Sequence, residues 1–378
     1  MNYRIPFNRP TLIPGAIGCV LEVIQGGRLS GNGPCTHRCE SRLTEITGSR
    51  TALLTNSCTS ALEMAALLLD ARPGDEVIVP SFTFVSTANA FAMHGFRPVF
   101  ADCRPGTLNV DATTISPLIG PRTRAILVMH YGGVACEMDE ILALARRHNL
   151  IVVEDNAHGL FAKYRGQPLG SLGALATQSF HETKNVTSGE GGALLVNDAA
   201  LVERAEVLRE KGTNRSRFFR GEVDKYTWVD LGSNYLASEM QAAYLLPQLR
   251  ASELVQSMRA AVWDRYDAAL GDWARANGVD RPTVPSHCEQ PSHLYYVLMP
   301  TASARARLID HLKTQGILAV FHYVPLNLSP MGRKLGGTEG ACPVAEDVSE
   351  RLLRLPFYTN LSADDQNDVI AAIHQFRV

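Results

Sequence analysis

Short, mainly apolar segments without polar alternation recur between residues 50 and 196, and they alternate with longer helical segments. A strand that is apolar throughout indicates a sheet covered on both faces, and intervening helices make such a sheet largely parallel. The pattern therefore predicts a large three-layer α/β/α domain with a mostly parallel sheet. Its predicted strands are residues 51–55, 76–79, 98–101, 125–129, 150–153, 177–180 and 193–196, and two of its helices are residues 60–69 and 138–147.

A different pattern follows in the last third of the chain. Ser303 and Ser362 are the expected N-caps of two helices there, because a hydroxyl can accept a hydrogen bond from the first free N–H groups. We expect a smaller C-terminal α+β domain over residues 246–378, after a large domain over residues 1–245 whose N-terminal arm has one helix before Gly26. Its predicted segments are a helix over residues 237–266, strands over 293–299 and 316–323, and a helix over 303–314.

The composition is that of an ordinary soluble globular protein, with 46% hydrophobic and 20% charged residues among 378. A formal net charge of −2 provides no basic field that would attract nucleic acid or an anionic membrane. No apolar run approaches the roughly 20 residues of a membrane span, and residues 1–6 lack the pattern of a signal peptide. We therefore expect a cytoplasmic enzyme or binding protein.

The eight cysteines are scattered along the chain. Only Cys35 and Cys39 lie close together, and no second cluster with the spacing of zinc ligands accompanies them. Reduced and mostly buried thiols are the expectation, with no metal and no disulfide.

Polar or aromatic residues follow three of the predicted strands. Asp155 ends the strand that begins at residue 150, residues 56–60 follow the first strand, and residues 81–84 follow the second. Ligands of open α/β sheets bind at the carboxyl ends of the strands. We therefore expect these residues to surround a ligand site.

Lys184 and Asp155 are the most informative residues in the chain. Lys184 lies just past one apolar strand, and Asp155 lies at the tip of another. Pyridoxal phosphate (PLP) chemistry needs such a pair, because an amine forms a Schiff base with the cofactor and a carboxylate keeps its pyridine nitrogen protonated. Taken alone the pair is weak evidence, since most lysines are solvated and an aspartate in this position can instead cap the next helix.

Three hydroxyl side chains are candidates for holding a phosphate. Thr59 and Ser60 begin a predicted helix, whose free N–H groups favour an anion, and Ser179 lies five residues before Lys184. The alternative for the first two is plain N-capping by Ser57 or Thr59, and for Ser179 it is an ordinary strand residue. A cap and a phosphate site can also coexist.

Two rings and a glycine-rich segment complete the candidates. Phe84 is placed to lie flat against a pyridine ring, and its alternative is a core phenylalanine. His158, three residues past Asp155, is a candidate donor to the cofactor's phenolic oxygen, and its alternative is a satisfied interior histidine. Residues 189–192, Gly-Glu-Gly-Gly, are typical of a loop that approaches a ligand closely, or of a tight turn.

These residues resemble those of the sugar aminotransferases of the DegT/DnrJ family, which have the fold of the type I PLP aminotransferases. The similarity spans nearly the whole chain. Three further stretches, residues 210–216, 220–221 and 223–228, resemble the members that make dTDP-4-amino-4,6-dideoxygalactose, a precursor of enterobacterial common antigen. The stretches that match the family are residues 80–87, 153–155, 179–181 with Lys184, 189–192, 241–244, 322–323 with Pro325, and 355–356.

The resemblance implies roles for individual residues. Lys184 takes the place of the Schiff-base lysine and proton carrier, and Asp155 that of the partner of the pyridine nitrogen. His322 and Tyr323 take the place of sugar contacts. Asn234 takes the place of a residue that reaches the phosphate from the neighbouring subunit, which implies a homodimer with shared active sites. The positions implied to bind PLP are Thr59, Ser60, Phe84, Asp155, His158, Ser179, Lys184 and Asn234.

The implied reaction moves an amino group from L-glutamate to dTDP-4-keto-6-deoxy-D-glucose and gives dTDP-4-amino-4,6-dideoxy-D-galactose. Two residues depart from the family pattern: Leu236 stands where many relatives have Arg or Lys, and Asn327 where His is frequent. Three alternatives stay open, namely an aminotransferase for a 3-keto sugar or another nucleotide, a dehydratase, and a nucleotide-sugar-binding relative without turnover. The dehydratases of the family carry His in place of the lysine, so Lys184 argues against that alternative.

Overall fold

The seven predicted strands of the large domain form one sheet in the computed structural model, which describes residues 3–378. Its strand order is β1-β9-β8-β5-β4-β2-β3. Strand β9 is antiparallel to both of its neighbours, and the other pairs are parallel, which confirms the mostly parallel sheet. The strands are β1 (Thr51–Thr55), β2 (Glu76–Pro80), β3 (Arg97–Ala101), β4 (Thr123–Met129), β5 (Ile151–Asp155), β8 (Leu175–Ser179) and β9 (Gly192–Val196).

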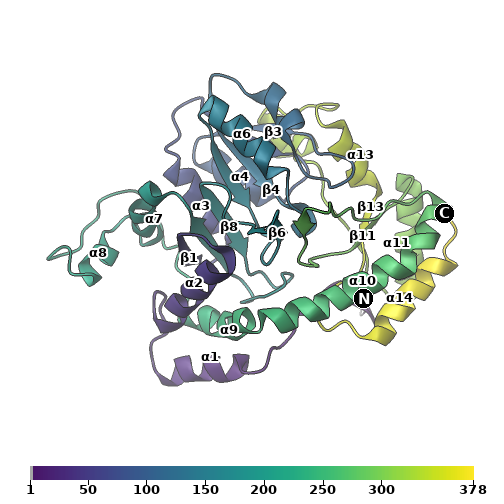
Figure 1. Cartoon of the computed structure of the whole chain (residues 1–378), viewed down its shortest axis with the longest axis horizontal. Helices are drawn as coiled ribbons and strands as arrows, with labels where there is room; N and C mark the ends of the chain where they lie inside the picture. Colours follow the sequence, from purple (N-terminus) through teal and green to yellow (C-terminus); the bar gives the residue numbers. More distant parts are fainter. Residues whose placement is uncertain (1–2) are drawn as a thin grey trace.

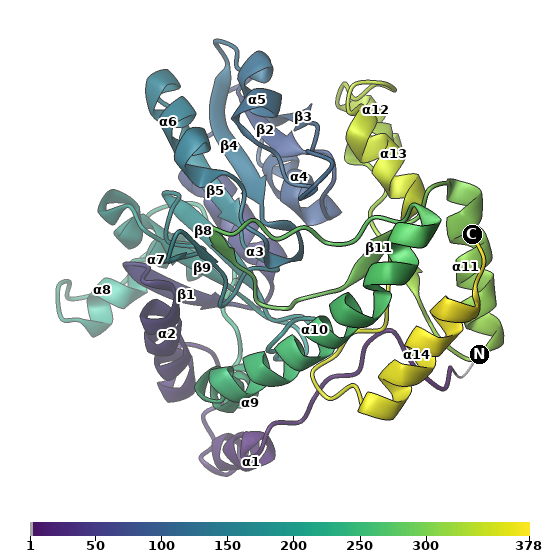
Figure 2. The ribbon, with the colours of Figure 1, turned by 45° about the vertical axis from the view of Figure 1, so that its right-hand side comes forward.

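Helices cover both faces of this sheet, as the continuously apolar strands predict (Figure 2). Along β2, Val77 and Val79 belong to one buried cluster and Ile78 to another, because successive side chains of a strand point to opposite faces. One face packs against α3 (Cys58–Leu68), α4 (Val85–Met93) and α7 (Val202–Arg209), and the other against α2 (Pro34–Thr47), α6 (Met138–His148) and α9 (Glu239–Arg250).

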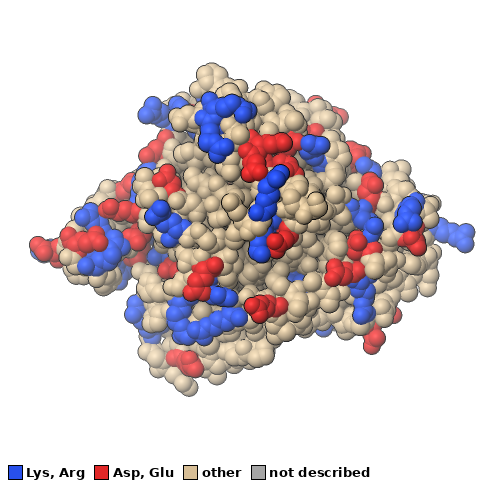
Figure 3. Space-filling view, viewed as in Figure 1, with Lys and Arg blue, Asp and Glu red and all other residues tan. Residues whose placement is uncertain are grey.

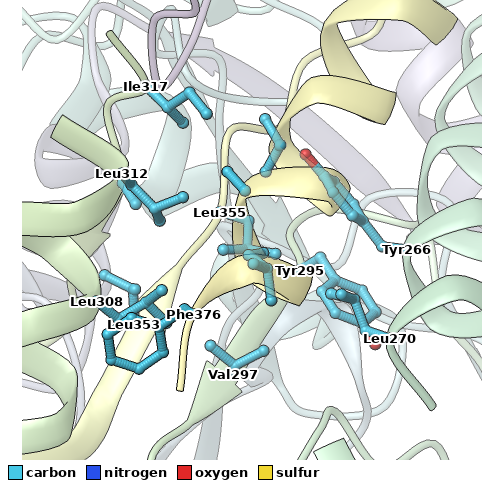
Figure 4. Close-up of a cluster of buried hydrophobic side chains, with 14 of the residues drawn as sticks. Tyr266, Leu270, Tyr295, Val297, Leu308, Leu312, Ile317, Leu353, Leu355 and Phe376 are labelled. Atoms are coloured by element: carbon cyan, nitrogen blue, oxygen red, sulfur yellow. The ribbon is translucent and has the colours of Figure 1, made fainter. Parts of the chain in front are cut away.

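The C-terminal part is built on a three-stranded antiparallel sheet in the order β11-β13-β12. Its strands are β11 (Tyr296–Leu298), β12 (Val320–Phe321) and β13 (Leu352–Arg354). Helices α10 (Ser252–Asn277), α11 (Ala302–Thr314) and α14 (Ala363–Gln375) pack against it around a buried cluster that includes Tyr266, Tyr295 and Leu353 (Figure 4). This arrangement is the predicted smaller α+β unit.

Two local predictions for this part are wrong. The long helix expected over residues 237–266 is two helices, α9 and α10, which meet at Ala251. Helix α11 is capped by Thr301 and not by Ser303, because the Thr301 side chain accepts a hydrogen bond from the N–H of Ala304. The predicted cap of α14 is confirmed, since Ser362 accepts from the N–H of Asp365.

The N-terminal arm crosses between the two parts of the chain. Its predicted helix is α1 (Ala16–Gln25), which lies beside α9 (Figure 1). Ile5, however, is buried in the C-terminal cluster, and its N–H donates to the carbonyl of Gly316. The predicted boundary between residues 245 and 246 falls within α9, so the division into two domains at this point stays a prediction.

Shorter elements connect these layers. A second small sheet has the order β10-β6-β7.

Lys and Arg side chains are interspersed with Asp and Glu over the face shown in Figure 3, including the projecting α8. No helix within residues 3–378 is long and apolar enough to cross a membrane. The remaining strands and α-helices are β6 (Lys163–Tyr164), β7 (Gln167–Pro168), β10 (Cys288–Glu289), α5 (Ala112–Ile115), α8 (Arg215–Phe219), α12 (Pro330–Lys334) and α13 (Pro343–Arg351).

Candidate active site

Strand β5 ends in two carboxylates that face opposite sides of the sheet. Glu154 is fully buried, and its Oε2 lies 3.0 Å from Nε2 of His130. Nδ1 of His130 accepts from the N–H of Cys136, so Nε2 carries the proton and donates to Glu154. The Glu154 carboxylate also accepts from the backbone N–H groups of Gly170, Leu172 and Gly173, and is therefore saturated.

Asp155 points to the opposite side and keeps capacity for a further partner. Its Oδ2 accepts from the hydroxyl of Thr87 at 2.7 Å, and its Oδ1 from the N–H of Ala157 at 3.2 Å. Burial raises the pKa of Asp155, while the two hydrogen bonds and the charge of Lys184 act to lower it. Burial disfavours the ionised form of a carboxylate, and a cationic N–H placed against the carboxylate stabilises that form. That property fits a protonated pyridine nitrogen.

Lys184 lines the same cavity as Asp155. It follows β8 after a short turn in which its N–H donates to the carbonyl of His181 at 2.9 Å. Burial lowers the pKa of Lys184 to about 8, and the charge of Arg354 acts in the same direction. The nearby Cys58 and Asp155 act in the opposite direction. The amine is thus neutral in a substantial fraction of molecules near neutral pH, as a nucleophile or base must be.

The cavity has a volume of about 670 Å³. This size suits a cofactor together with part of a substrate. The cavity brings together most of the residues singled out from the sequence, which come from both parts of the chain. The predicted residues that line it are Thr59, Phe84, Asp155, His158, Ser179, Lys184, His322 and Tyr323.

Ser60 and Asn234 are the two predicted residues that do not line this cavity. Ser57 is the N-cap of α3 and accepts from the N–H of Ser60 at 3.0 Å, while the hydroxyl of Ser60 donates to Oδ1 of Asn56. Ser57 therefore caps α3, as the alternative to phosphate binding predicts, and the N–H of Ser60 is the donor to this cap. Asn234 lines a second cavity of about 820 Å³ on the same chain. The predicted roles of Ser60 and Asn234 in phosphate binding stay predictions.

The beginning of α3 and the beginning of β9 approach each other at backbone distance. A Cβ atom on Gly192 would lie 2.4 Å from the N of Cys58 and 2.5 Å from the carbonyl oxygen of Ser57. Ser57, Thr59 and Ser179 line the cavity beside this contact. A helix N-terminus surrounded by hydroxyls is a suitable site for a phosphate, so the residues present fit PLP.

His158 is a neutral imidazole that lines the cavity. Burial holds the pKa of His158 well below its usual range. Its Nδ1 accepts from the N–H of Gly132 at 3.3 Å, so the proton of the ring is on Nε2. The geometry makes His158 a hydrogen-bond donor, as its predicted role near the phenolic oxygen requires.

His293 stacks on His158 with ring centroids 4.2 Å apart. Its Nδ1 lies 2.8 Å from Oδ1 of Asn185, whose NH₂ group is occupied by other acceptors, so Nδ1 of His293 is the donor. Burial also keeps the pKa of His293 well below its usual range. His293 lines the cavity, yet no feature of its local sequence indicates this position.

His322 and Arg354 form another contact that the sequence analysis missed. Nη1 of Arg354 lies 3.3 Å from Nε2 of His322, and the hydroxyl of Tyr131 lies 3.0 Å from Nδ1. A guanidinium can only donate, so Nε2 of His322 is the acceptor and its proton is on Nδ1. Tyr323 packs edge-on against Phe82 and lies near Phe84.

Thr87 is the missed residue that a sequence signal could have identified. It follows Thr83 by one helical turn, and the two hydroxyls are 2.9 Å apart. Thr87 is in the first turn of α4, and helical side chains tilt toward the N-terminus of their helix, which here begins beside the site. Arg354 and His293 carry no such signal, because they come from the small unit and reach the cavity only through the tertiary fold.

The lowered pKa of Lys184 has a direct consequence for cofactor loading. At pH 7 roughly a tenth of amines with a pKa near 8 are neutral, against well under a thousandth for an ordinary lysine. The rate of covalent PLP addition to the cofactor-free protein should therefore rise with pH to a plateau, with a midpoint at about 8. Absorbance measured after rapid mixing between pH 6 and pH 10 tests this, and a midpoint near the ordinary lysine value of 10.5 would contradict it.

This fold and cavity define a PLP-dependent aminotransferase of fold type I. The sequence signature of the DegT/DnrJ/EryC1/StrS aminotransferase family matches residues 14–374, and the chain belongs to this family. It is 35% identical to GDP-perosamine synthase of Caulobacter vibrioides over 99% of both chains. The predicted family, fold class, PLP cofactor and sugar aminotransferase activity are thereby confirmed.

Two solved structures are similar over 98% of both chains. The aminotransferase TlmJ from Streptoalloteichus hindustanus is 33% identical to this chain, with a TM-score of 0.89. The sugar aminotransferase Spr1654 from Streptococcus pneumoniae, solved in its PLP form, is 26% identical, with a TM-score of 0.91.

Proposed function

We propose that this aminotransferase converts dTDP-4-keto-6-deoxy-D-glucose to dTDP-4-amino-4,6-dideoxy-D-galactose with L-glutamate as amino donor. The observation that carries the chemistry is Lys184, an amine with a lowered pKa, in one cavity with the buried carboxylate of Asp155. Support for the substrate comes from residues 210–216, 220–221 and 223–228, which resemble enzymes of that specificity. The relative named GDP-perosamine synthase also takes its name from a nucleotide-linked amino sugar.

Bound PLP supplies an electron sink and carries the amino group between the two substrates. Asp155 would hold the ring nitrogen in its protonated form, since its carboxylate is buried and has room for one more donor. Nε2–H of His158 would donate to the phenolic oxygen. Thr59 and Ser179 would hold the phosphate, and Phe84 would pack against the ring.

Lys184 would move the proton in both half-reactions. In its neutral form Nζ takes the proton from the α-carbon of the amino donor, and in its protonated form it returns a proton to C4 of the sugar. A pKa near 8 allows both, because neither form is rare near neutral pH. The face of the sugar that receives this proton decides whether the product has the galacto or the gluco configuration.

We further propose a homodimer with shared sites, working in the cytoplasm. Asn234 lies outside the cavity of its own chain, which is where a residue serving the neighbouring subunit would lie. The segment around α8 exposes large apolar side chains: Trp228 is 75% exposed, Leu231 63% and Phe219 64%. Such exposure in a single chain is typical of residues that a second subunit covers. All eight cysteines are free, which suits a reducing compartment.

Product analysis by NMR tests the substrate assignment. The protein is incubated with L-glutamate and either dTDP-4-keto-6-deoxy-D-glucose or the corresponding GDP-linked 4-keto sugar. We expect turnover of the dTDP sugar, with coupling constants of an axial amine at C4. An equatorial amine at C4 would contradict the galacto product, and a clear preference for the GDP sugar would contradict the dTDP substrate. A 3-amino product would require a 3-keto substrate.

A further inference from the structure

Two buried threonine hydroxyls connect the beginning of α4 to the carboxylate of Asp155. Thr87 is in the first turn of α4, and Thr83 lies just before this helix. The hydroxyl oxygens of Thr83 and Thr87 are 2.9 Å apart, and that of Thr87 lies 2.7 Å from Oδ2 of Asp155. Both threonines are almost completely buried, and neither lines the cavity that contains Lys184. The two hydroxyls are therefore placed to act on Asp155 and not on a ligand.

The direction of these hydrogen bonds follows from the carboxylate at their end. An ionised carboxylate can only accept, so the hydroxyl of Thr87 donates to Asp155. A hydroxyl has one proton to donate, so Thr87 must accept from Thr83. Both protons thus point toward the charge, and hydrogen bonds arranged in such a chain strengthen one another. The chain fits the ionised form of Asp155.

The hydrogen bond from Thr87 is also the strongest influence that opposes the effect of burial on Asp155. Burial raises the pKa of Asp155, and the groups that lower it are Thr87 first, then the N–H of Ala157 and the charge of Lys184. The bond to Thr87 is shorter than the 3.2 Å contact of Oδ1 with Ala157. Oδ2 is therefore the more firmly held oxygen, and Oδ1 has more capacity for a further donor.

We propose that Thr87, supported by Thr83, is a positioning residue that holds the Asp155 carboxylate in place and in its charged form, so that the ring nitrogen of bound PLP stays protonated. This inference rests on the role of Asp155 in the proposed function. It adds to that role two residues that reach the cofactor only through the carboxylate.

Another buried threonine shows what a purely structural hydroxyl looks like in this protein. Thr47 ends α2, and its hydroxyl donates to the carbonyl of Leu43 one turn earlier at 2.7 Å. Such a bond to the preceding turn is the usual arrangement for a threonine in a helix. Thr87 is equally buried but bonds two side chains, one of which is the carboxylate of the site. Thr47→Val is therefore a matched control for Thr87→Val.

The first test measures the protonation of the ring nitrogen and needs neither substrate. The protein is loaded with PLP carrying ¹⁵N in the ring, and the ¹⁵N chemical shift is measured by solid-state NMR. The wild type should show a protonated nitrogen, and in Thr87→Val the signal should move toward that of the unprotonated ring. Thr87→Ser keeps a hydroxyl and should restore the wild-type signal, while Thr47→Val should leave it unchanged.

The second test asks whether Thr87 acts through Asp155. Single-turnover rates are measured with L-glutamate and with the dTDP-4-amino sugar, which drives the sugar half-reaction backwards. Thr87→Val should slow both about 10- to 100-fold, the magnitude of losing a hydrogen bond to a charged group. In the Asp155→Ala background the same change should cost less than about twofold, because the acceptor of the hydrogen bond is already absent.

Thr83→Val extends both tests, because it leaves the bond between Thr87 and Asp155 in place. We expect it to move the ¹⁵N signal in the same direction as Thr87→Val, with a smaller loss of rate. It also keeps the tests decisive where Thr87→Val does not fold, since an unmoved signal and unchanged rates in Thr83→Val would then overturn the inference.

The outcomes separate this inference from the proposed function. A protonated ring in both the wild type and Thr87→Val would overturn it, and so would an equal loss of rate with and without Asp155, which is the result for a structural role. An unprotonated ring in the wild type would reject the role of Asp155 as well. Failure of the dTDP-4-amino sugar to react would reject the proposed sugar alone, because the ¹⁵N signal still decides the role of Thr87.

Discussion

Replacing Lys184 by methionine should lower the rate of transamination at least about 10⁴-fold, because the variant loses the amine that both binds the cofactor and moves the proton. Methionine has a similar length and no charge, so it removes a group whose ionised form is disfavoured at this position. We therefore expect the variant to fold, with a thermal unfolding temperature at or above that of the wild type. Turnover is measured under saturating L-glutamate and keto sugar.

The covalent link to PLP provides an independent readout of the same variant. Borohydride reduction should fix PLP to the wild type and leave Lys184→Met unlabelled, as seen by mass spectrometry. Lys163→Met is the matched control, since Lys163 is an exposed lysine paired with Glu289. Activity within tenfold of wild type in Lys184→Met, or labelling at a different lysine, would show that another amine performs the chemistry.

Replacing Asp155 by alanine should slow both half-reactions by about 10²- to 10³-fold, the magnitude typical of losing one preorganised electrostatic group. The carboxylate keeps the ring nitrogen protonated, and both substrates depend on the same electron sink. The expected pattern is therefore a similar loss with both amino donors. Single-turnover rates with L-glutamate and with the amino sugar measure it.

Asp198→Ala is the matched control for the Asp155 variant. Asp198 is an exposed aspartate that caps a short helix and lies outside the cavity. The main local change in Asp155→Ala is that the Thr87 hydroxyl and the Ala157 N–H lose their carboxylate acceptor, so circular dichroism should stay that of the wild type. Near-normal rates in both half-reactions would remove the role assigned to Asp155.

Much of the large domain follows from the order of apolar residues along the chain. Strand β1 begins and ends at the predicted residues, and each of the others differs from the prediction by one or two residues at one end or at both. These strands are buried on both faces, so their sequences carry a strong and local signal. Strand β13 was missed, because a three-residue strand contains too few positions to show a period.

Some residues of the candidate site could likewise be found from the sequence, and others could not. Asp155 and Lys184 could be found because each adjoins a strong apolar strand and because PLP chemistry needs that pair. Ser303 was wrongly assigned as the cap of α11, because Thr301, two residues earlier, offers an equivalent hydroxyl. The helix begins after Thr301, which only the backbone conformation shows. The role of Asn234 depends on a second subunit, so a single chain does not test it.

The sequence by itself determined the layered α/β/α domain, the lysine–aspartate pair and the hydroxyls at the start of α3, because these depend on local apolar patterns and on residue chemistry. Only the tertiary structure decided which side chains from the small unit complete the cavity. His293 and Arg354 lie more than a hundred residues from Lys184 in sequence, yet they line the same space. Their placement follows from the packing of two sheets joined by α9 and α10, and such long-range contacts leave no periodic trace in a sequence.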